Sequence, residues 1–238
     1  MPKRRNFNVE VVEGHMGKFW RENSLSIVLF LMFLFAVIGQ AIAGNMEYNE
    51  EQQEHGEQGV GMVEYLGTGH FIEAIFENWE SEFLQMGMYI VLTIFLRQKG
   101  SSESKKLEGE EPVDADPRDK KERKKKGAPG PVKQGGFILK IYENSLSITF
   151  FALFFMSFAL HAFGGAEDYN QEQLAHGGQT VTTLGYLGTS RMWFESFQNW
   201  QSEFMAIGAI VVLSIFLRQK GSPESKPVAA PHFETGSE

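Results

Sequence analysis

Long apolar segments without charge restrict the folds open to this chain more than any other feature of its sequence. Residues 25–43 carry no charged side chain, and residues 145–166 carry one ionisable side chain, His161. Two shorter uncharged runs lie at residues 83–96 and 204–217. Uncharged apolar runs of about 18 residues or more are typical of membrane-spanning helices. The charge of the chain, a net -8 over 238 residues, lies almost entirely between these segments.

The apolar segments belong to two halves with similar sequences. Residues 22–105 align without a gap with residues 143–226, and about half of the aligned positions are identical. The string IFLRQKGS closes both halves, at residues 94–101 and 215–222. Each half has the pattern of an apolar helix, a polar loop and a second apolar helix. The sequence therefore predicts an all-α membrane protein with four transmembrane helices, arranged as two tandem helical hairpins that form a parallel repeat.

Five regions follow from this pattern. The two-helix membrane repeats are expected at residues 18–101 and 137–222. Residues 102–136 between them are rich in charge, Pro and Gly and hold almost no large apolar residue, so they are predicted to be a disordered linker. Residues 1–17 are a predicted N-terminal tail, and residues 223–238 a disordered C-terminal tail.

Basic residues gather at one end of the predicted helices. Those that follow the second and fourth helices are expected to anchor the helix ends: Arg97, Lys99, Arg218 and Lys220. The loop at residues 45–80 has no Lys or Arg, and the loop at residues 166–201 has only Arg191. Because Lys and Arg near membrane segments stay in the cytoplasm, both termini and the linker are predicted to be cytoplasmic. Both loops are then external.

The second and fourth helices must begin before their apolar runs. A run of about 14 residues spans roughly 21 Å, whereas the hydrocarbon core is about 30 Å thick. Thr68 is a suitable N-cap, so the second helix is predicted to run from Gly69 to Arg97. Trp79 and Trp200 then lie at the outer membrane interface, where aromatic anchors are enriched.

Polar side chains are expected at similar depth near the outer edge of the membrane: Gln40, Glu82, His161 and Glu203. We expect His161 to bond to Glu203 or Glu82, and Gln40 to bond to the matching glutamate. Two interpretations are open. Such bonds hold helices together with about 1 kcal/mol each, or the side chains form a relay for protons or cations.

Both external loops contain a Glu and a His four residues apart: Glu51 with His55, and Glu172 with His176. In a helix each pair shares one face, where a carboxylate and an imidazole could bind a metal. Two ligands per loop do not complete a site, so no metal is predicted. A solvent-exposed helix that ends at Gly56 or Gly177 explains the same pattern.

Several classes of function lack the residues they need. The chain has no Cys, which excludes disulfides, thiolate metal sites and a cysteine nucleophile. It has no glycine-rich phosphate loop, nucleophile elbow, HExxH or dinucleotide fingerprint. We therefore expect neither an enzyme nor a cofactor, and an acidic chain whose basic cluster lies in its linker is not expected to bind nucleic acid. The expected partner is the lipid bilayer, with other membrane proteins or copies of the chain as candidates.

Four strings carry a resemblance to a known family: FWRENSLS at 19–26, NEEQQEHG at 49–56, FENWESEF at 76–83 and FLRQKGS at the close of each half. The chain resembles a family of uncharacterised bacterial multi-pass membrane proteins, classed as a domain of unknown function and present here as two tandem copies. The resemblance implies a bacterial cytoplasmic membrane and no catalytic activity. It favours a structural or interaction component of that membrane. The alternative is a small proton or cation transporter or channel that uses the intramembrane Glu and His residues.

Overall fold

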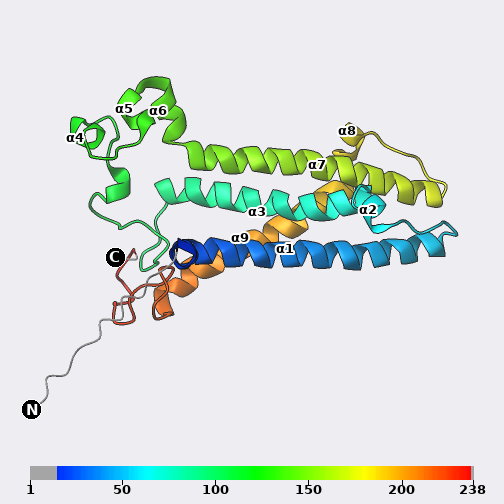
Figure 1. Cartoon of the computed structure of the whole chain (residues 1–238), viewed down its shortest axis with the longest axis horizontal. Coiled ribbons are helices and arrows are strands. Elements are labelled where there is room, and N and C mark those ends of the chain that lie inside the picture. Colours follow the sequence, from blue (N-terminus) through cyan, green and yellow to red (C-terminus); the bar gives the residue numbers. More distant parts are fainter. Residues whose placement is uncertain (1–14, 237–238) are drawn as a thin grey trace, which may run out of the picture. The chain divides into compact units, whose positions relative to one another are not determined.

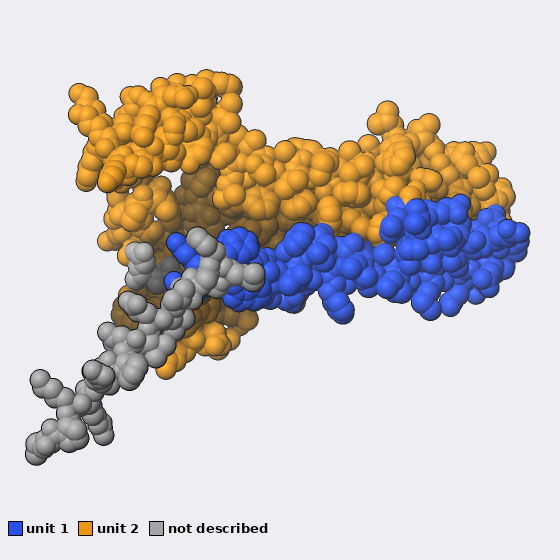
Figure 2. All heavy atoms as spheres, viewed as in Figure 1, with its two compact units in different colours: residues 1–66 blue, residues 67–238 orange. Residues whose placement is uncertain are grey.

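The computed structural model describes residues 15–236, and every regular element within that range is a helix. The chain divides into two compact units, residues 1–66 and residues 67–238 (Figure 2). The all-α prediction is confirmed for the described part of the chain. The N-terminal tail predicted at residues 1–17 lies outside the described residues, apart from the first helical residues.

The first unit is one long helix with a folded-back loop. Helix α1 (His15–Glu54) has 40 residues, and α2 (Met62–Tyr65) is a single turn (Figure 1). The Asn49 side chain holds the loop to α1, because its Oδ1 accepts from the Val60 N–H at 2.6 Å and its Nδ2 donates to the Val60 carbonyl at 3.0 Å. The Tyr65 ring lies against Tyr48 and crosses α1 at Gly44, where a Cβ atom would meet the Tyr65 hydroxyl at 2.2 Å.

The second unit is built on three long helices: α3 (Gly69–Phe95), α7 (Ser145–Ala175) and α9 (Ser190–Phe216). Helix α3 packs along α7 and also against α9 (Figure 1). Two glycines allow α3 and α7 to touch backbone to backbone. A Cβ on Gly164 would lie 2.6 Å from the Glu73 amide nitrogen, and a Cβ on Gly69 would lie 2.6 Å from the Gly164 carbonyl oxygen. This contact fixes which residues of α3 lie beside the middle of α7.

The ends of α3 and α9 follow from local sequence. The Thr68 hydroxyl accepts from the Phe71 N–H at 3.3 Å, and the Thr189 hydroxyl accepts from the Met192 N–H at the same distance. The predicted start at Gly69 is thus confirmed, whereas the helix ends at Phe95, two residues before the predicted Arg97. Arg97 and Arg218 fold back on their helix ends, and each donates from Nη1 to three terminal carbonyls. A cation there satisfies carbonyls that have no partner in the helix.

Three helices are long and apolar enough to cross a membrane: Lys18–Glu54, Ser145–Ala175 and Ser190–Phe216. Three candidate spans are therefore found among the described residues, not the four predicted in two hairpins, and a crossing by α3 stays a prediction. The helix that falls short is α3, because its first half carries four glutamates. The hairpin pairing also changes within the second unit, where α3 of the first half packs along α7 of the second half.

The segments between and after the long helices form short helical turns: η1 (Pro112–Asp114), α4 (Lys120–Arg123), α5 (Gly130–Gln134), α6 (Gly136–Tyr142) and, between α7 and α9, α8 (Thr183–Tyr186). In the C-terminal segment the Lys226 ammonium group donates to backbone carbonyls of Gly100, Pro231, His232 and Glu234. Disorder of residues 102–136 and 223–238 in solution stays a prediction.

Candidate functional site: a buried carboxylate–imidazole cluster

The His161 side chain, in the middle of α7, is fully buried and contacts carboxylates from two other helices. Its Nδ1 lies 2.8 Å from Glu80 Oε2 on α3, and its Nε2 lies 3.3 Å from Glu195 Oε2 on α9. A neutral imidazole has one N–H and one bare lone pair. Two ionised carboxylates at both ring nitrogens therefore require one more positive charge, either a second proton or another cation.

Two more carboxylates of α3 complete this group. Glu73 and Glu77 are one helical turn apart, so they share a face. The carboxylate oxygens of Glu73 and Glu77 and a ring nitrogen of His161 all lie within 4.8 Å of one another, which is a set of donors that could hold a metal ion. We call Glu73, Glu77, Glu80, His161 and Glu195 the His161 cluster.

Neighbouring donors fix the orientation of two of the carboxylates. Trp200 on α9 donates its indole N–H to Glu80 Oε1 at 3.0 Å, so both oxygens of the fully buried Glu80 are engaged. The Asn199 side-chain amide donates to Glu77 Oε1. Each of these bonds joins α9 to α3.

Arg191 lies at the partly exposed edge of the cluster and contacts four carboxylates. Its Nε donates to Glu195 Oε1, its Nη2 to Asp168 Oδ2 and its Nη1 to Glu172 Oε2, all at 2.7 Å. Its Nη2 also lies 3.5 Å from Glu73 Oε1. One guanidinium thus ties α3, α7 and α9 together. Arg191 is the lone basic residue of the loop at residues 166–201, and its partners are these four carboxylates.

Tyr186, the last residue of α8, covers the same end of the cluster. Its hydroxyl donates to Glu195 Oε2 at 2.6 Å, and its ring is fully buried against Gly165, where a Cβ would lie 2.6 Å from ring carbon Cε1. Burial raises the pKa of the Tyr186 phenol, and its bond to Glu195 acts in the same direction. The phenol therefore remains protonated and a hydrogen-bond donor at neutral pH.

The charges around this site do not balance. Carboxylates outnumber cations in the group made by Glu73, Glu77, Glu80, Asp168, Glu172 and Glu195. Two basic side chains, Arg191 and His161, contact these carboxylates within the described part of the chain. Buried charges are retained when they are paired or bind a cation, and otherwise they take up protons. The arrangement is suited to holding protons or a metal ion.

The structure places the predicted intramembrane residues differently from the expectation. His161 is central, but its partners are Glu80 and Glu195, and the predicted bonds to Glu82 or Glu203 are wrong. Glu82 is exposed, and the Gln85 side chain reaches the backbone carbonyl of Glu203. Glu80 and Glu82 differ by two residues, which is about 200° around the helix. The two side chains therefore point in nearly opposite directions from α3, and it is Glu80 that meets α7.

Gln40, the residue aligned with His161, lies half-buried on α1 in the first unit. Its predicted bond to a glutamate stays a prediction. Trp200, predicted as an interface anchor, donates its indole N–H to Glu80. Trp79 packs edge-on against Phe76 and Phe83 on its own helix. Lys99 and Lys220 follow the ends of α3 and α9, as the sequence requires.

The candidate outer-loop pairs behave as helix ends. His176 Nδ1 lies 2.9 Å from the backbone carbonyl of Glu172, whereas the Glu172 carboxylate binds Arg191. Gly56 and Gly177 adopt φ of 77° and 69°, the left-handed conformation that ends a helix. The same ending follows Glu51 and His55, where the Gly56 N–H donates to the Gln53 carbonyl. The structure thus favours the exposed-helix interpretation of both loops.

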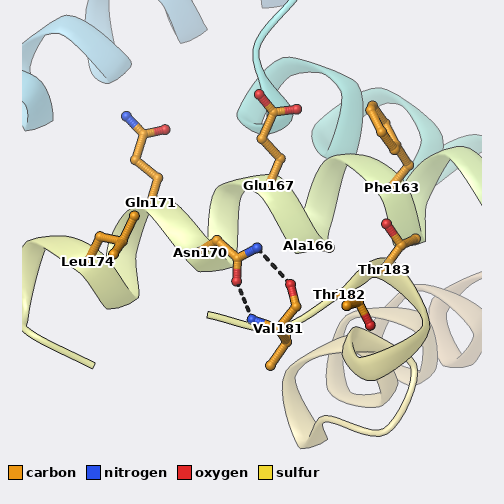
Figure 3. A pocket seen from close by; sticks show the side chains of 9 residues that line it. All are labelled: Phe163, Ala166, Glu167, Asn170, Gln171, Leu174, Val181, Thr182 and Thr183. Atoms are coloured by element: carbon orange, nitrogen blue, oxygen red, sulfur yellow. Dashed lines mark hydrogen bonds between the residues drawn. The ribbon is translucent and has the colours of Figure 1, made fainter. Parts of the chain in front are cut away.

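An open pocket of about 660 Å³ lies beside the C-terminal half of α7 (Figure 3). Asn170 forms one wall and holds Val181 by two hydrogen bonds, of 2.8 Å and 2.7 Å. Glu167 is the ionisable side chain among its lining residues. The pocket does not include any member of the His161 cluster.

Sequence reasoning missed Glu73, Glu77, Glu80, Glu195, Arg191 and Tyr186 as site residues. One signal was available. Aligned positions of the two halves differ at His161 and Gln40, at Glu77 and Gln198, and at Glu80 and Gln201. The ionisable member of each of these pairs lies in one buried cluster. A search for positions where one half has an ionisable residue and the other half has Gln would have selected those three cluster residues.

Comparison with known proteins gives one match. A family model for a domain of unknown function, DUF6766, matches residues 16–237. It covers both halves once, so the interpretation as two tandem copies of the family domain is corrected to a single copy. No curated protein and no solved structure matches the chain. The chain belongs to the DUF6766 family of unknown function.

Proposed function

We propose that this protein is an integral membrane protein that takes up protons or cations at the His161 cluster, as a small transporter or channel does. The observation that supports this most is the His161 ring, fully buried, with each nitrogen facing a carboxylate of a different helix. Intramembrane Glu and His residues of this kind are costly unless paired, and in membrane proteins they mark ion and proton pathways. No chemical transformation of a substrate is proposed.

The proposal includes four membrane crossings, with α3 as the additional one, and both termini in the cytoplasm of a bacterium. The apolar second half of α3, residues 83–95, supports the fourth crossing. Its acidic first half is directed at α7 and α9, because Glu73, Glu77 and Glu80 contact residues of those helices. Carboxylates shielded by neighbouring helices cost less in a membrane than carboxylates exposed to lipid.

A second candidate function is a structural or interaction component of the membrane. The contact that favours it is the Arg191 side chain, which joins carboxylates of α3, α7 and α9 in one network. A fully paired network of this kind stabilises a helix bundle without moving an ion. The two functions are distinguished by transport, because only the first requires passage of an ion.

Flux measurements in liposomes test the proposal. Purified protein would be reconstituted, and proton and monovalent or divalent cation flux would be followed with encapsulated dyes. The wild type would be compared with Glu80→Gln and His161→Gln, which introduce the residues that the other half carries at Gln201 and Gln40. We expect flux in the wild type and at least a tenfold loss in both variants.

The matched control is Glu82→Gln, since Glu82 is on the same helix but exposed and away from His161. This variant is expected to keep wild-type flux. Absence of flux from well-folded wild type, or equal loss in the control, would reject the transport function and leave the structural one.

A further inference from the structure

We infer that the His161 cluster is a binding site for a divalent first-row transition metal such as Zn²⁺ or Mn²⁺, with Glu73, Glu77 and His161 as its ligands and Glu195 beside them. This inference names the class of cation that the proposed function would move. A role of the metal in transport rests on the proposed function, whereas metal binding does not. Three independent features of the second unit support it: the spacing of the donors, the partners behind them and two buried hydroxyl groups.

The donor atoms are already close to the arrangement a metal needs. One carboxylate oxygen of Glu73, one of Glu77 and one ring nitrogen of His161 all lie within 4.8 Å of one another. Nitrogen and oxygen ligands bind Zn²⁺ at about 2.0–2.2 Å, so ligand atoms around one ion are roughly 3–4 Å apart. Small rotations of the glutamate side chains are therefore sufficient to bring them onto one ion. The face-sharing positions of Glu73 and Glu77 on α3 keep both oxygens on the side of α7.

The groups behind these donors match the support found at metal sites. When His161 Nδ1 carries the proton, it donates to Glu80 at 2.8 Å, and Glu80 is itself held by the Trp200 indole N–H. Nε2 then has its lone pair directed toward Glu195 Oε2, 3.3 Å away. A histidine that ligates a metal usually donates its other N–H to a carboxylate in this way, which sets its tautomer. The Nε2 lone pair and Glu195 Oε2 are both hydrogen-bond acceptors, so a cation is needed between or beside them.

Two buried hydroxyl groups provide the independent observation. Ser157 and Ser196 are 0% and 1% exposed, and neither side-chain oxygen has a hydrogen-bond partner within residues 15–236. Ser157 is one turn before His161 on α7, and Ser196 is one turn before Trp200 on α9, so each shares a face with a residue that reaches Glu80. Buried polar groups are otherwise satisfied in folded proteins. The two hydroxyls, one helical turn from His161 and Trp200, thus have room for a further polar partner, and water carried by a bound cation is a partner of that kind.

The donor set also selects the class of metal. One imidazole with several carboxylates suits Zn²⁺, Mn²⁺ or Fe²⁺, whereas Mg²⁺ and Ca²⁺ favour oxygen ligands alone. Thiolate-selective metals are disfavoured because the chain has no Cys. The competing occupant is a proton, since protonation of His161 or a carboxyl group balances the same charge. Metal affinity should therefore fall as the pH is lowered and protons compete for the ligands.

Metal binding by the full-length protein tests this inference. The protein would be purified in detergent, stripped with a chelator, and titrated with Zn²⁺ and with Mn²⁺ by calorimetry, while metal content is measured after dialysis. We expect about one equivalent of Zn²⁺ per chain in the wild type. Glu77→Gln and His161→Gln are expected to weaken binding by tenfold or more, because each removes one ligand. Glu82→Gln is the matched control and is expected to bind like the wild type.

Two further readouts separate lost ligands from lost folding. X-ray absorption at the zinc edge is expected to show nitrogen and oxygen ligands that include one imidazole, and the imidazole signal should disappear in His161→Gln. Far-UV circular dichroism would establish that the variants keep their helices.

The outcomes for binding and flux are distinguishable. Stoichiometric binding that depends on His161 and Glu77 supports the metal site even when no flux is found, and only the transport function then fails. Cluster-dependent proton flux without metal binding would overturn the metal site and keep the transport function. Less than one equivalent of Zn²⁺ per chain in the wild type would also overturn the metal site. So would Zn²⁺ affinities of Glu77→Gln and His161→Gln that are no weaker than the affinity of Glu82→Gln.

Discussion

The Trp200 indole N–H donates to Glu80 Oε1 at 3.0 Å, and these residues belong to different long helices, α9 and α3. The other oxygen of Glu80 faces His161 of α7. One buried carboxylate is therefore shared by all three long helices of the second unit. Loss of either of its partners should be measurable as a loss of stability.

Trp200→Phe keeps most of the ring packing but removes the donor to Glu80. Leaving a buried carboxylate oxygen without its partner costs about 1–3 kcal/mol. We expect a lower thermal midpoint in detergent, measured by circular dichroism. Trp193→Phe serves as the comparison, because that exposed indole donates to the Leu187 carbonyl at 2.9 Å. A loss in Trp200→Phe no greater than in Trp193→Phe would count against the Glu80 contact.

Arg191→Met removes the cation that contacts four carboxylates. Breaking a fully buried ion pair costs about 3–5 kcal/mol, and the Arg191 side chain is 30% exposed, so we expect a smaller loss of about 2 kcal/mol. The deficit should be largest at neutral pH, where the carboxylates repel one another. It should shrink as the pH falls, because the acidic groups take up protons. A deficit that does not change between pH 7 and pH 4 would show that repulsion is not its cause.

Gly164→Ala should separate α3 from α7. The added Cβ would lie 2.6 Å from the Glu73 backbone nitrogen, so a helix rather than a side chain must move. Overpacking of this kind costs about 1–3 kcal/mol. Gly208→Ala is the matched control on α9, since its Cβ would meet no atom within 4 Å. That control is expected to raise stability by up to about 1 kcal/mol, because Ala favours helix more than Gly does. Equal effects of the two variants would contradict the close contact.

Tyr186→Phe tests the cover of the cluster. Burial, which is the main cause, raises the pKa of the Tyr186 phenol, so this tyrosine should not ionise when ordinary tyrosines do near pH 10. An alkaline absorbance titration of the wild type and the variant should therefore give the same amplitude up to that pH while the fold persists. The variant is expected to lose about 1–2 kcal/mol of stability with its bond to Glu195. A smaller tyrosinate amplitude in the variant near pH 10 would show that Tyr186 titrates normally.

Much of the helical framework could be predicted from sequence because its causes are local. Apolar composition predicts α1, α7 and α9, and Thr68 and Thr189 mark helix starts by supplying a side-chain acceptor. Arg97 and Arg218 mark the ends by the same local logic. These features depend on neighbours within four residues.

The partners of His161 could not be predicted, because they depend on how α3 is rotated against α7. Depth along a helix placed Glu82 at the right height, but a two-residue shift turns the side chain to the other face. The rotation is set by the backbone contact between Gly69 and Gly164, which belong to different halves of the chain. Packing across the halves, rather than any single segment, selects Glu80.

Cross-linking in membranes tests most directly whether His161 faces Glu80. The chain has no Cys, so His161→Cys with Glu80→Cys and His161→Cys with Glu82→Cys each introduce two unique thiols. After reaction with a short bifunctional thiol reagent, trypsin would cut the exposed linker at Lys124–Lys126. The two fragments should stay joined for the pair at 161 and 80 and separate for the pair at 161 and 82. Equal or stronger joining of the pair at 161 and 82 would contradict the His161 cluster and the functions built on it.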